Sequence, residues 1–246
     1  MSSMINLYDQ FRLYMGEMLL IVSYLKKRNI VHRDLSLNSF IIDSKGYLKL
    51  IDFASAKFLK DYACSVVGEP MYCAPEMIKG KGYSSSCDYW SIGVCGYALL
   101  YNKYPFEDFD ISDPIKLYQS IVNDEIKYPK EWEGISEDMK NKLKDMNHLL
   151  KGLLCRNINK RLCDLYLIKE IPLFKGYDFQ QLLEFNIKAP YIPNVDACNL
   201  NDIIKNDKEI KYLEHEDILI KNTTGKDSLF ERIELWQCDC RWADEF

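Results

Sequence analysis

The sequence predicts a mainly α-helical fold: a helical bundle with short β-hairpins, followed by an extended tail. Two segments carry most of this prediction. From Phe11 to Lys27, apolar residues recur at the spacing of one helical face. From 88 to 100 nearly every residue is apolar, which is typical of a helix buried on all sides. Between them, the loop at 52–75 has no period, and compact domains usually keep loops this long for a function.

Shorter elements complete the domain. Ile30 and Val31 form a short apolar run, and residues 40–51 predict a β-hairpin because Asp43-Ser-Lys-Gly46 makes a turn between two apolar runs. Periodicity weakens after Phe174, so we expect a domain over residues 1–174 and a tail over 175–246. Further helical patterns occur at 112–124, 136–154 and 164–170.

Composition excludes several classes of protein. Hydrophobic residues make up 48% of the chain, too many for a disordered protein, and the net charge of −5 argues against nucleic acid as the main partner. No stretch approaches the roughly 20 apolar residues that a membrane span needs. The nine cysteines are an odd number, and the first residues do not resemble a secretory signal. We therefore expect reduced thiols and a cytoplasmic protein.

Several short motifs and one distant arginine occur in a fixed order along the chain. They are His32-Arg-Asp34 before the hairpin, Asp52-Phe-Ala54 after it, Ala74-Pro-Glu76 at the end of the long loop, Asp88 at the start of the buried helix, and Arg161. Each motif alone is a weak signal. Their common order and spacing resemble the C-terminal lobe of a eukaryotic protein kinase.

Two further stretches are similar to one group of protein kinases. The loop Gly68-Glu-Pro-Met-Tyr-Cys-Ala-Pro-Glu76 resembles that of the cyclic-nucleotide-dependent (AGC) group. In the tail, Ala189-Pro-Tyr-Ile-Pro-Asn-Val195 resembles the same group. The terminal Trp242-Ala-Asp-Glu-Phe246 is similar to the acidic, Phe-ended tail of cGMP-dependent protein kinases. The resemblance implies a kinase C-terminal lobe over 1–174 and an extended AGC-type tail over 175–246.

The resemblance also implies chemical roles. Asp34 would accept the proton of a substrate hydroxyl, and Asp52 would hold the Mg²⁺ that bridges the phosphates of ATP. Arg33, helped by Lys57, would bind a phosphate on Ser65, which aligns with the family's phosphorylated activation-loop residue. From the residues alone, Asp34 and Asp52 could each instead cap a loop through an Asx turn.

Other positions would bind the nucleotide or support the loops. By resemblance, Ile41 would form part of the nucleotide-binding wall, and Leu200 stands where the tail of the family has a Phe that touches adenine. The supporting positions are His32 and Phe53 in a regulatory stack of apolar side chains, Asp88 as the anchor of the catalytic-loop backbone, and the buried pair Glu76 and Arg161.

Three positions depart from the family pattern. Kinases carry Lys two residues and Asn five residues after the catalytic Asp, where this chain has Ser36 and Ser39. Ser36 removes a positive charge beside the transferred phosphate, and Ser39 is a weaker Mg²⁺ ligand than an amide oxygen. Glu69 replaces a Thr and adds a negative charge near Asp34. Each lost charge-stabilising group typically costs about 10²–10³ in rate.

The similarity begins just before the helix that precedes the catalytic loop, so a Gly-rich loop and the Lys that pairs with ATP are not found. We therefore expect a pseudokinase that binds protein partners, with doubtful affinity for ATP and Mg²⁺. The alternative is a fragment or truncated gene model of an ATP-dependent Ser/Thr kinase acting on protein substrates. In the family the terminal Phe docks in a groove on the N-terminal lobe, so by resemblance Trp242 and Phe246 lack a partner within the chain, and we expect them to dock on another molecule.

Overall fold

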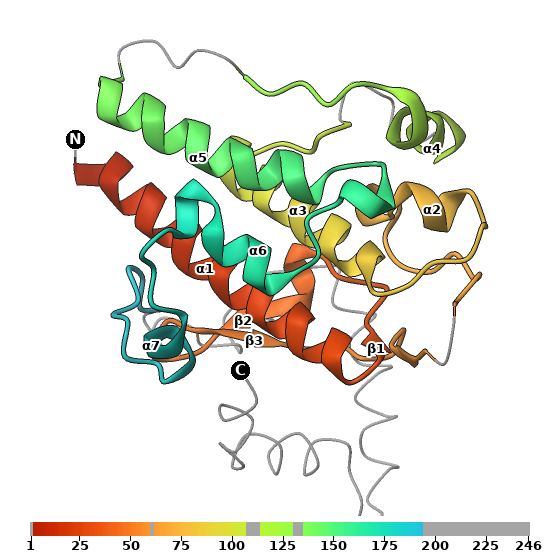
Figure 1. The fold of residues 1–246 in the computed structure, drawn as a ribbon, viewed down its shortest axis with the longest axis horizontal. Coiled ribbons are helices and arrows are strands. Elements are labelled where there is room, and N and C mark those ends of the chain that lie inside the picture. Colours follow the sequence, from red (N-terminus) through yellow and green to blue (C-terminus); the bar gives the residue numbers. More distant parts are fainter. Residues whose placement is uncertain (1, 60–61, 107–113, 130–134, 194–246) are drawn as a thin grey trace, which may run out of the picture. The chain divides into compact units, whose positions relative to one another are not determined.

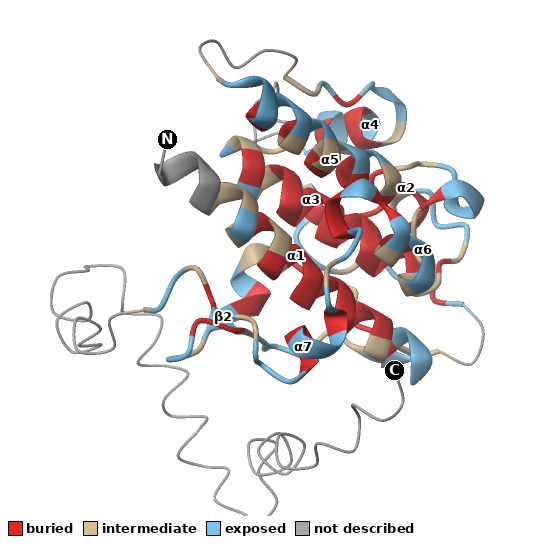
Figure 2. Cartoon of the chain, turned by 60° about the vertical axis from the view of Figure 1, so that its left-hand side comes forward, coloured by how far each residue is buried: buried red, intermediate tan, exposed pale blue. Residues whose placement is uncertain are grey.

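Long helices form the frame of the domain. In the computed structural model, which describes residues 2–59, 62–106, 114–129 and 135–193, these are α1 (Ser2–Lys27), α3 (Ser86–Tyr101) and α5 (Glu137–Leu153). They lie side by side, with α3 packed against both α1 and α5 (Figure 1). Figure 2 shows that buried residues run along α3 and the inner face of α1. The core is therefore a helix-on-helix layer around α3.

Helix α3 is the element that the composition of 88–100 predicted to be buried. Trp90 and Tyr89 are fully buried, and Asn102 ends the helix in the left-handed conformation at φ 51°. Gly96 brings the neighbouring helices close, because a Cβ there would lie only 2.8 Å from both Leu150 of α5 and Met15 of α1. The apolar run thus packs on two helices at once.

Shorter helices cover this frame. Side chains cap the starts of two of them and of the long helix α5: Ser136 accepts a hydrogen bond from the backbone at the start of α5, Asp164 does so at α6, and Asp178 at α7. The helices are α2 (Pro75–Ile78), α4 (Pro114–Asn123), α6 (Leu165–Glu170) and α7 (Phe179–Leu183). Single 3₁₀ turns are η1 (Leu37–Ser39), η2 (Pro70–Tyr72), η3 (Ile158–Lys160) and η4 (Pro172–Phe174).

Two small antiparallel sheets flank α1. Strand β2 (Phe40–Ile42) pairs with β3 (Leu48–Leu50), with Phe40 opposite Leu50, and this confirms the hairpin predicted over 40–51. Strand β1 (Ile30–Val31) pairs with β4 (Lys57–Phe58). The sequence did not reveal β4, since a two-residue strand is too short to show a period.

The predicted fold class is confirmed: the described part of the chain is mainly helical with short strands, as in a kinase C-terminal lobe. The predicted helices at 112–124, 136–154 and 164–170 correspond to α4, α5 and α6. The domain boundary expected at 174 stays a prediction. Among the described helices, none is long and apolar enough to cross a membrane. Leu200, Trp242 and Phe246 lie outside the described residues.

Candidate active site

The loop that carries His32-Arg-Asp34 is held by a buried carboxylate from α3. Asp88, only 2% exposed, accepts hydrogen bonds from the backbone nitrogens of His32 at 2.8 Å and Arg33 at 2.9 Å. Arg33 has φ 72°, a conformation that costs free energy for a residue with a side chain. The two bonds to Asp88 hold the loop in this strained form. Burial raises the pKa of Asp88 to about 6, although these backbone bonds act in the opposite direction.

Asp34 lies against the loop that precedes α2. Its Oδ1 accepts a hydrogen bond from the backbone nitrogen of Glu69 at 3.1 Å. Gly68, at φ 91°, allows this approach, because a Cβ there would lie 2.7 Å from the carbonyl oxygen of Arg33. Partial burial raises the pKa of Glu69, and the negative charge of Asp34 raises it further. The structure therefore brings Glu69 close to Asp34.

Ser36 and Ser39 close the loop on itself through a capping box around η1. The backbone nitrogen of Ser36 donates to Oγ of Ser39 at 3.1 Å, and Oγ of Ser36 accepts from the backbone nitrogen of Asn38 at 3.2 Å. Ser39 also donates from Oγ to the carbonyl oxygen of Asp34 at 2.8 Å. Both serines are buried, so their hydroxyls serve the loop backbone rather than the surface beside Asp34.

Asp52 follows the β2–β3 hairpin and is exposed. It has φ 61°, and its Oδ1 accepts a hydrogen bond from the backbone nitrogen of Ala54 at 3.2 Å. This is the Asx turn that the sequence left open as an alternative, and it engages one of the two carboxylate oxygens. Next to it, Phe53 meets His32 edge to face with ring centroids 5.1 Å apart. Burial lowers the pKa of His32, so the ring is neutral at neutral pH.

Arg33 reaches the activation loop. Its Nη1 donates to Oγ of Ser65 at 3.0 Å, and its Nε donates to the carbonyl oxygen of Ser55 at 2.6 Å. The hydroxyl of Tyr83 donates to the carbonyl oxygen of Ser65 at 2.6 Å. Ser65 is exposed, so its hydroxyl lies between solvent and the guanidinium. Lys57, the second cation expected beside it, is exposed on β4.

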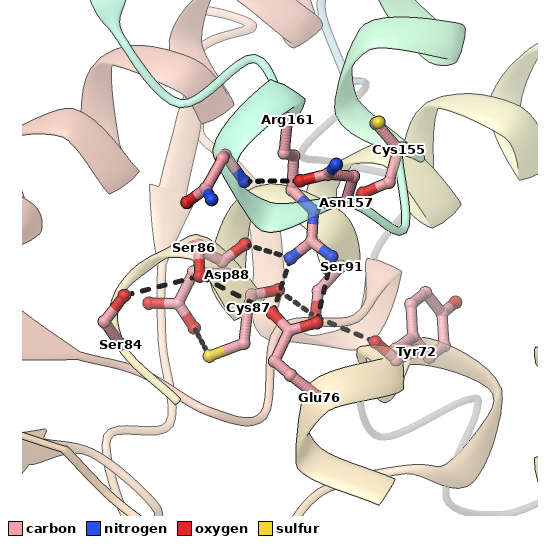
Figure 3. Close-up of polar contacts among 11 residues, drawn as sticks. Tyr72, Glu76, Ser84, Ser86, Cys87, Asp88, Ser91, Cys155, Asn157 and Arg161 are labelled. Atoms are coloured by element: carbon pink, nitrogen blue, oxygen red, sulfur yellow. Dashed lines mark hydrogen bonds and ion pairs between the residues drawn. The ribbon is translucent and has the colours of Figure 1, made fainter. Parts of the chain in front are cut away.

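A buried ion pair fixes the end of the activation loop to the C-terminal part of the domain. Glu76 accepts from Nη1 of Arg161 at 2.5 Å and from Nη2 at 2.9 Å (Figure 3). The same guanidinium donates to the carbonyl oxygens of Ser86 and Cys155. Arg161 also lies over the ring of Trp90, 5.2 Å from the ring centroid. Both charges are therefore paired and hydrogen-bonded out of solvent.

Comparison with known proteins identifies the family. Residues 4–172 match the family model described as the protein kinase domain. The chain belongs to the protein kinase family. It is 35% identical over 188 residues to a cAMP-dependent protein kinase catalytic subunit of Arthrobotrys oligospora and to a cGMP-dependent protein kinase of Eimeria tenella. It is 32% identical over 188 residues to cAMP-dependent protein kinase type 3 of Saccharomyces cerevisiae.

These matches support the resemblance to the cyclic-nucleotide-dependent group. Each of the three covers 75% of this chain, but only 34%, 18% and 44% of the respective relative. The chain therefore spans less than half the length of these curated relatives. Protein kinases use ATP and Mg²⁺ to phosphorylate protein substrates.

The positions expected to hold Mg²⁺ and ATP differ in their surroundings within the described part of the chain. Asp52 offers one free carboxylate oxygen, whereas the hydroxyl of Ser39 is engaged with the loop backbone. No group of three or more His, Cys, Asp or Glu side chains suited to a metal ion occurs among the described residues. Ile41, expected in the nucleotide-binding wall, is 47% exposed on β2. Of the two expected metal-binding positions, Asp52 is therefore exposed, whereas Ser39 is bonded to its own loop.

Sequence reasoning missed several supporting residues. Tyr83 and Ser55 position Ser65 and Arg33, and Ser86 contributes a carbonyl oxygen to the Glu76–Arg161 pair. All three contacts have a backbone carbonyl oxygen as acceptor, and the partner of a backbone atom depends on the fold rather than on residue type. A sequence motif therefore cannot predict these contacts.

Proposed function

We propose that this chain is a pseudokinase lobe: a protein-kinase C-terminal lobe that binds protein partners and does not transfer phosphate efficiently. The observation that carries the proposal is the capping box between Ser36 and Ser39. A kinase needs a cation at the first of these positions and a metal-binding amide at the second. Here both positions hold buried neutral hydroxyls bonded to their own loop, so neither can balance the charge of ATP phosphates.

Glu69 adds to this deficit. Its backbone is bonded to Asp34, and the raised pKa of its carboxyl reflects burial and the neighbouring negative charge. A substrate hydroxyl that approached Asp34 would meet an additional carboxylate, and the triphosphate would meet electrostatic repulsion. Losses of charge stabilisation around one reacting group reduce the rate even where the general base is kept.

The proposal is tested on the full chain by isothermal titration with Mg²⁺ and ATP, and by transfer of labelled phosphate to a peptide. We expect no binding at micromolar ATP and no incorporation. Micromolar affinity, or incorporation that Asp34→Asn abolishes, would contradict the proposal. The double variant Ser36→Lys/Ser39→Asn provides a gain-of-function control, since it returns the cation and the amide ligand that the site lacks.

An ATP-dependent Ser/Thr kinase, of which this chain is a part, is the second candidate. The contact between Arg33 and Ser65 favours it, because a phosphate on Ser65 would lie within reach of the guanidinium. The exposed carboxylate of Asp52 also favours it. In this case Ser65→Glu should stabilise the activation loop, and Arg33→Ala should remove that gain. If the two variants act independently on thermal stability, the role proposed for Ser65 is wrong.

We also propose that the tail docks on a partner through Trp242 and Phe246, which flank the acidic residues Asp244 and Glu245. Aromatic side chains are common anchors of protein interfaces, where full burial of one is worth at least about 2 kcal/mol. Deletion of residues 241–246 should reduce partner recovery or change the association state. If neither changes, the docking role is excluded. Free thiols at the described cysteines support a cytoplasmic setting for such a partner.

A further inference from the structure

Helix α1 carries a carboxyl group that the proposed function does not use. Glu17 is only 6% exposed, and its Oε2 accepts a hydrogen bond from the backbone nitrogen of Leu48 on β3 at 3.1 Å. Buried carboxylates usually have a cationic partner. Among the described residues, no Lys, Arg or His forms an ion pair with Glu17.

The titratable groups around Glu17 are acidic or neutral. Tyr14 lies one turn away on α1, and its hydroxyl has no hydrogen-bond partner among the described residues. The neighbouring elements contribute Asp43 and Tyr47 from the hairpin, Tyr177 from the turn before α7, and Tyr191 from the segment that follows α7.

Arg12, on the same helix, contacts other groups: its guanidinium lies 4.3 Å from the ring centroid of Tyr177, and its Nη2 donates to the carbonyl oxygen of Lys175. Burial therefore dominates, and it raises the pKa of Glu17 to about 8, although the bond from Leu48 lowers it in part. At neutral pH the folded protein holds this side chain mostly in its neutral form.

Residues 184–193, called the strap here, close over the same hairpin. The hydroxyl of Tyr47 lies 2.5 Å from the carbonyl oxygen of Phe185 and 2.7 Å from that of Ile187, and it donates to this pair of acceptors. The rings of Tyr47 and Phe185 meet edge to face at 4.9 Å. At the hairpin turn, Gly46 has φ 94°, and a Cβ there would collide with the carbonyl oxygen of Tyr191. The hairpin is thus enclosed between α1 and the strap.

We propose that Glu17 is a proton-dependent latch, which in its neutral form holds the β2–β3 hairpin and the strap against α1 and in its ionised form releases them. An ionised carboxylate without a cation at this depth gains hydration by opening the structure. Release of the hairpin would also disturb the candidate active site. Strand β3 leads directly into Ile51 and Asp52, and the backbone nitrogen of Ile51 donates to the carbonyl oxygen of Ser39. The latch does not depend on the proposed function.

Hydrogen exchange of the full chain between pH 6 and pH 9, corrected for intrinsic exchange rates, tests the latch. In the wild type we expect protection of 40–50 and of the strap to fall by up to about tenfold per pH unit between pH 6 and pH 8, because the opened state ionises more readily, and to level off above the folded-state pKa of about 8. In Glu17→Gln, which keeps the shape and the acceptor but cannot ionise, protection should stay constant. Glu170→Gln, at the exposed end of α6, is the matched control and should behave as the wild type.

A second measurement keeps the proposal testable if Glu17→Gln folds poorly. Carboxyl-¹³C NMR of the wild type should show one glutamate whose resonance titrates near pH 8, over the pH range in which the strap opens. Equal pH dependence of protection in the wild type and Glu17→Gln would overturn the latch. Titration of every glutamate below pH 6 would overturn it as well.

Discussion

The two sides of the candidate active site differ in the charge of their buried side chains. On the side of α3, the charges of Asp88, Glu76 and Arg161 are buried and each has hydrogen-bond partners. On the side that would face ATP, neutral hydroxyls stand at Ser36 and Ser39, where kinases have a cation and an amide. In the described part of the chain, the contacts that hold the lobe together are present, whereas Ser36 and Ser39 on the other side are bonded to their own loop.

The two sets of residues meet different physical requirements: one set stabilises the fold, and the other would bind phosphate. A buried carboxylate without its donors destabilises the folded state, so the α3 side is needed by any chain with this fold. A cation whose partner is a bound phosphate contributes little to the folding free energy of the chain without that ligand. The comparison therefore predicts large stability effects on the first side and small ones on the second.

The largest effect is expected from the Glu76–Arg161 pair. Arg161→Ala leaves the Glu76 carboxylate buried without its cation and also removes the bonds to Ser86 and Cys155, so we expect unfolding to become easier by about 3–5 kcal/mol. Urea denaturation monitored by tryptophan fluorescence measures it. Lys140→Ala, which breaks the exposed pair with Glu137, is the control and should cost less than about 1 kcal/mol. Equal costs for the two variants would contradict the assignment.

Asp88→Ala is expected to have the next largest effect. It leaves the backbone nitrogens of His32 and Arg33 without an acceptor, which costs about 1–3 kcal/mol. Hydrogen exchange of these two amides should accelerate as the loop relaxes from the φ of 72° at Arg33. Asp88→Asn keeps one acceptor oxygen and should lose less. Unchanged thermal stability in Asp88→Ala would show that Asp88 does not anchor the loop.

Much of this scaffold was predictable from the sequence, because its signals are local. The apolar run at 88–100 predicted the buried helix, and Asp43-Ser-Lys-Gly46 predicted the hairpin that the structure contains. The motif order also placed Glu76 and Arg161 in one family pattern. These features depend on periodicity, turn residues and motif spacing, all of which a sequence displays directly.

The rest required the fold. The sequence identified Ser36 and Ser39 as departures from the kinase pattern, but their mutual capping depends on the backbone of η1. Glu17 gave no signal, since a glutamate on an amphipathic helix is normally exposed. Its burial arises because residues more than 160 positions later, in the strap, close over the hairpin that it contacts. Such long-range enclosure has no local sequence signature.

On the phosphate-facing side, Ser39→Ala should have a modest effect. It removes the acceptor for the backbone nitrogen of Ser36 and the donor to the carbonyl oxygen of Asp34, so we expect a loss of about 1 kcal/mol. Differential scanning calorimetry measures it with and without Mg²⁺. Because the hydroxyl serves the loop rather than a metal, Mg²⁺ should not change the difference between variant and wild type. A difference that grows with Mg²⁺ would assign Ser39 to metal binding instead.

The smallest effect is expected at Glu69, and its sign depends on pH. The pKa of Glu69 is raised in the folded protein by partial burial and by Asp34, so the folded state binds a proton more tightly than the unfolded chain does. The stability contributed by this carboxyl is therefore present at low pH. It is lost as the pH rises above the ordinary pKa of a glutamate, which is near 4. Glu69→Gln cannot ionise, so it should match the wild type near pH 4 and exceed it at pH 7. Since the side chain is largely exposed, the gain should be only a few tenths of a kcal/mol. Paired denaturation curves at the two pH values measure it. A variant that is less stable than the wild type at pH 7 would show that the Glu69 carboxylate is stabilised by a partner rather than repelled by Asp34.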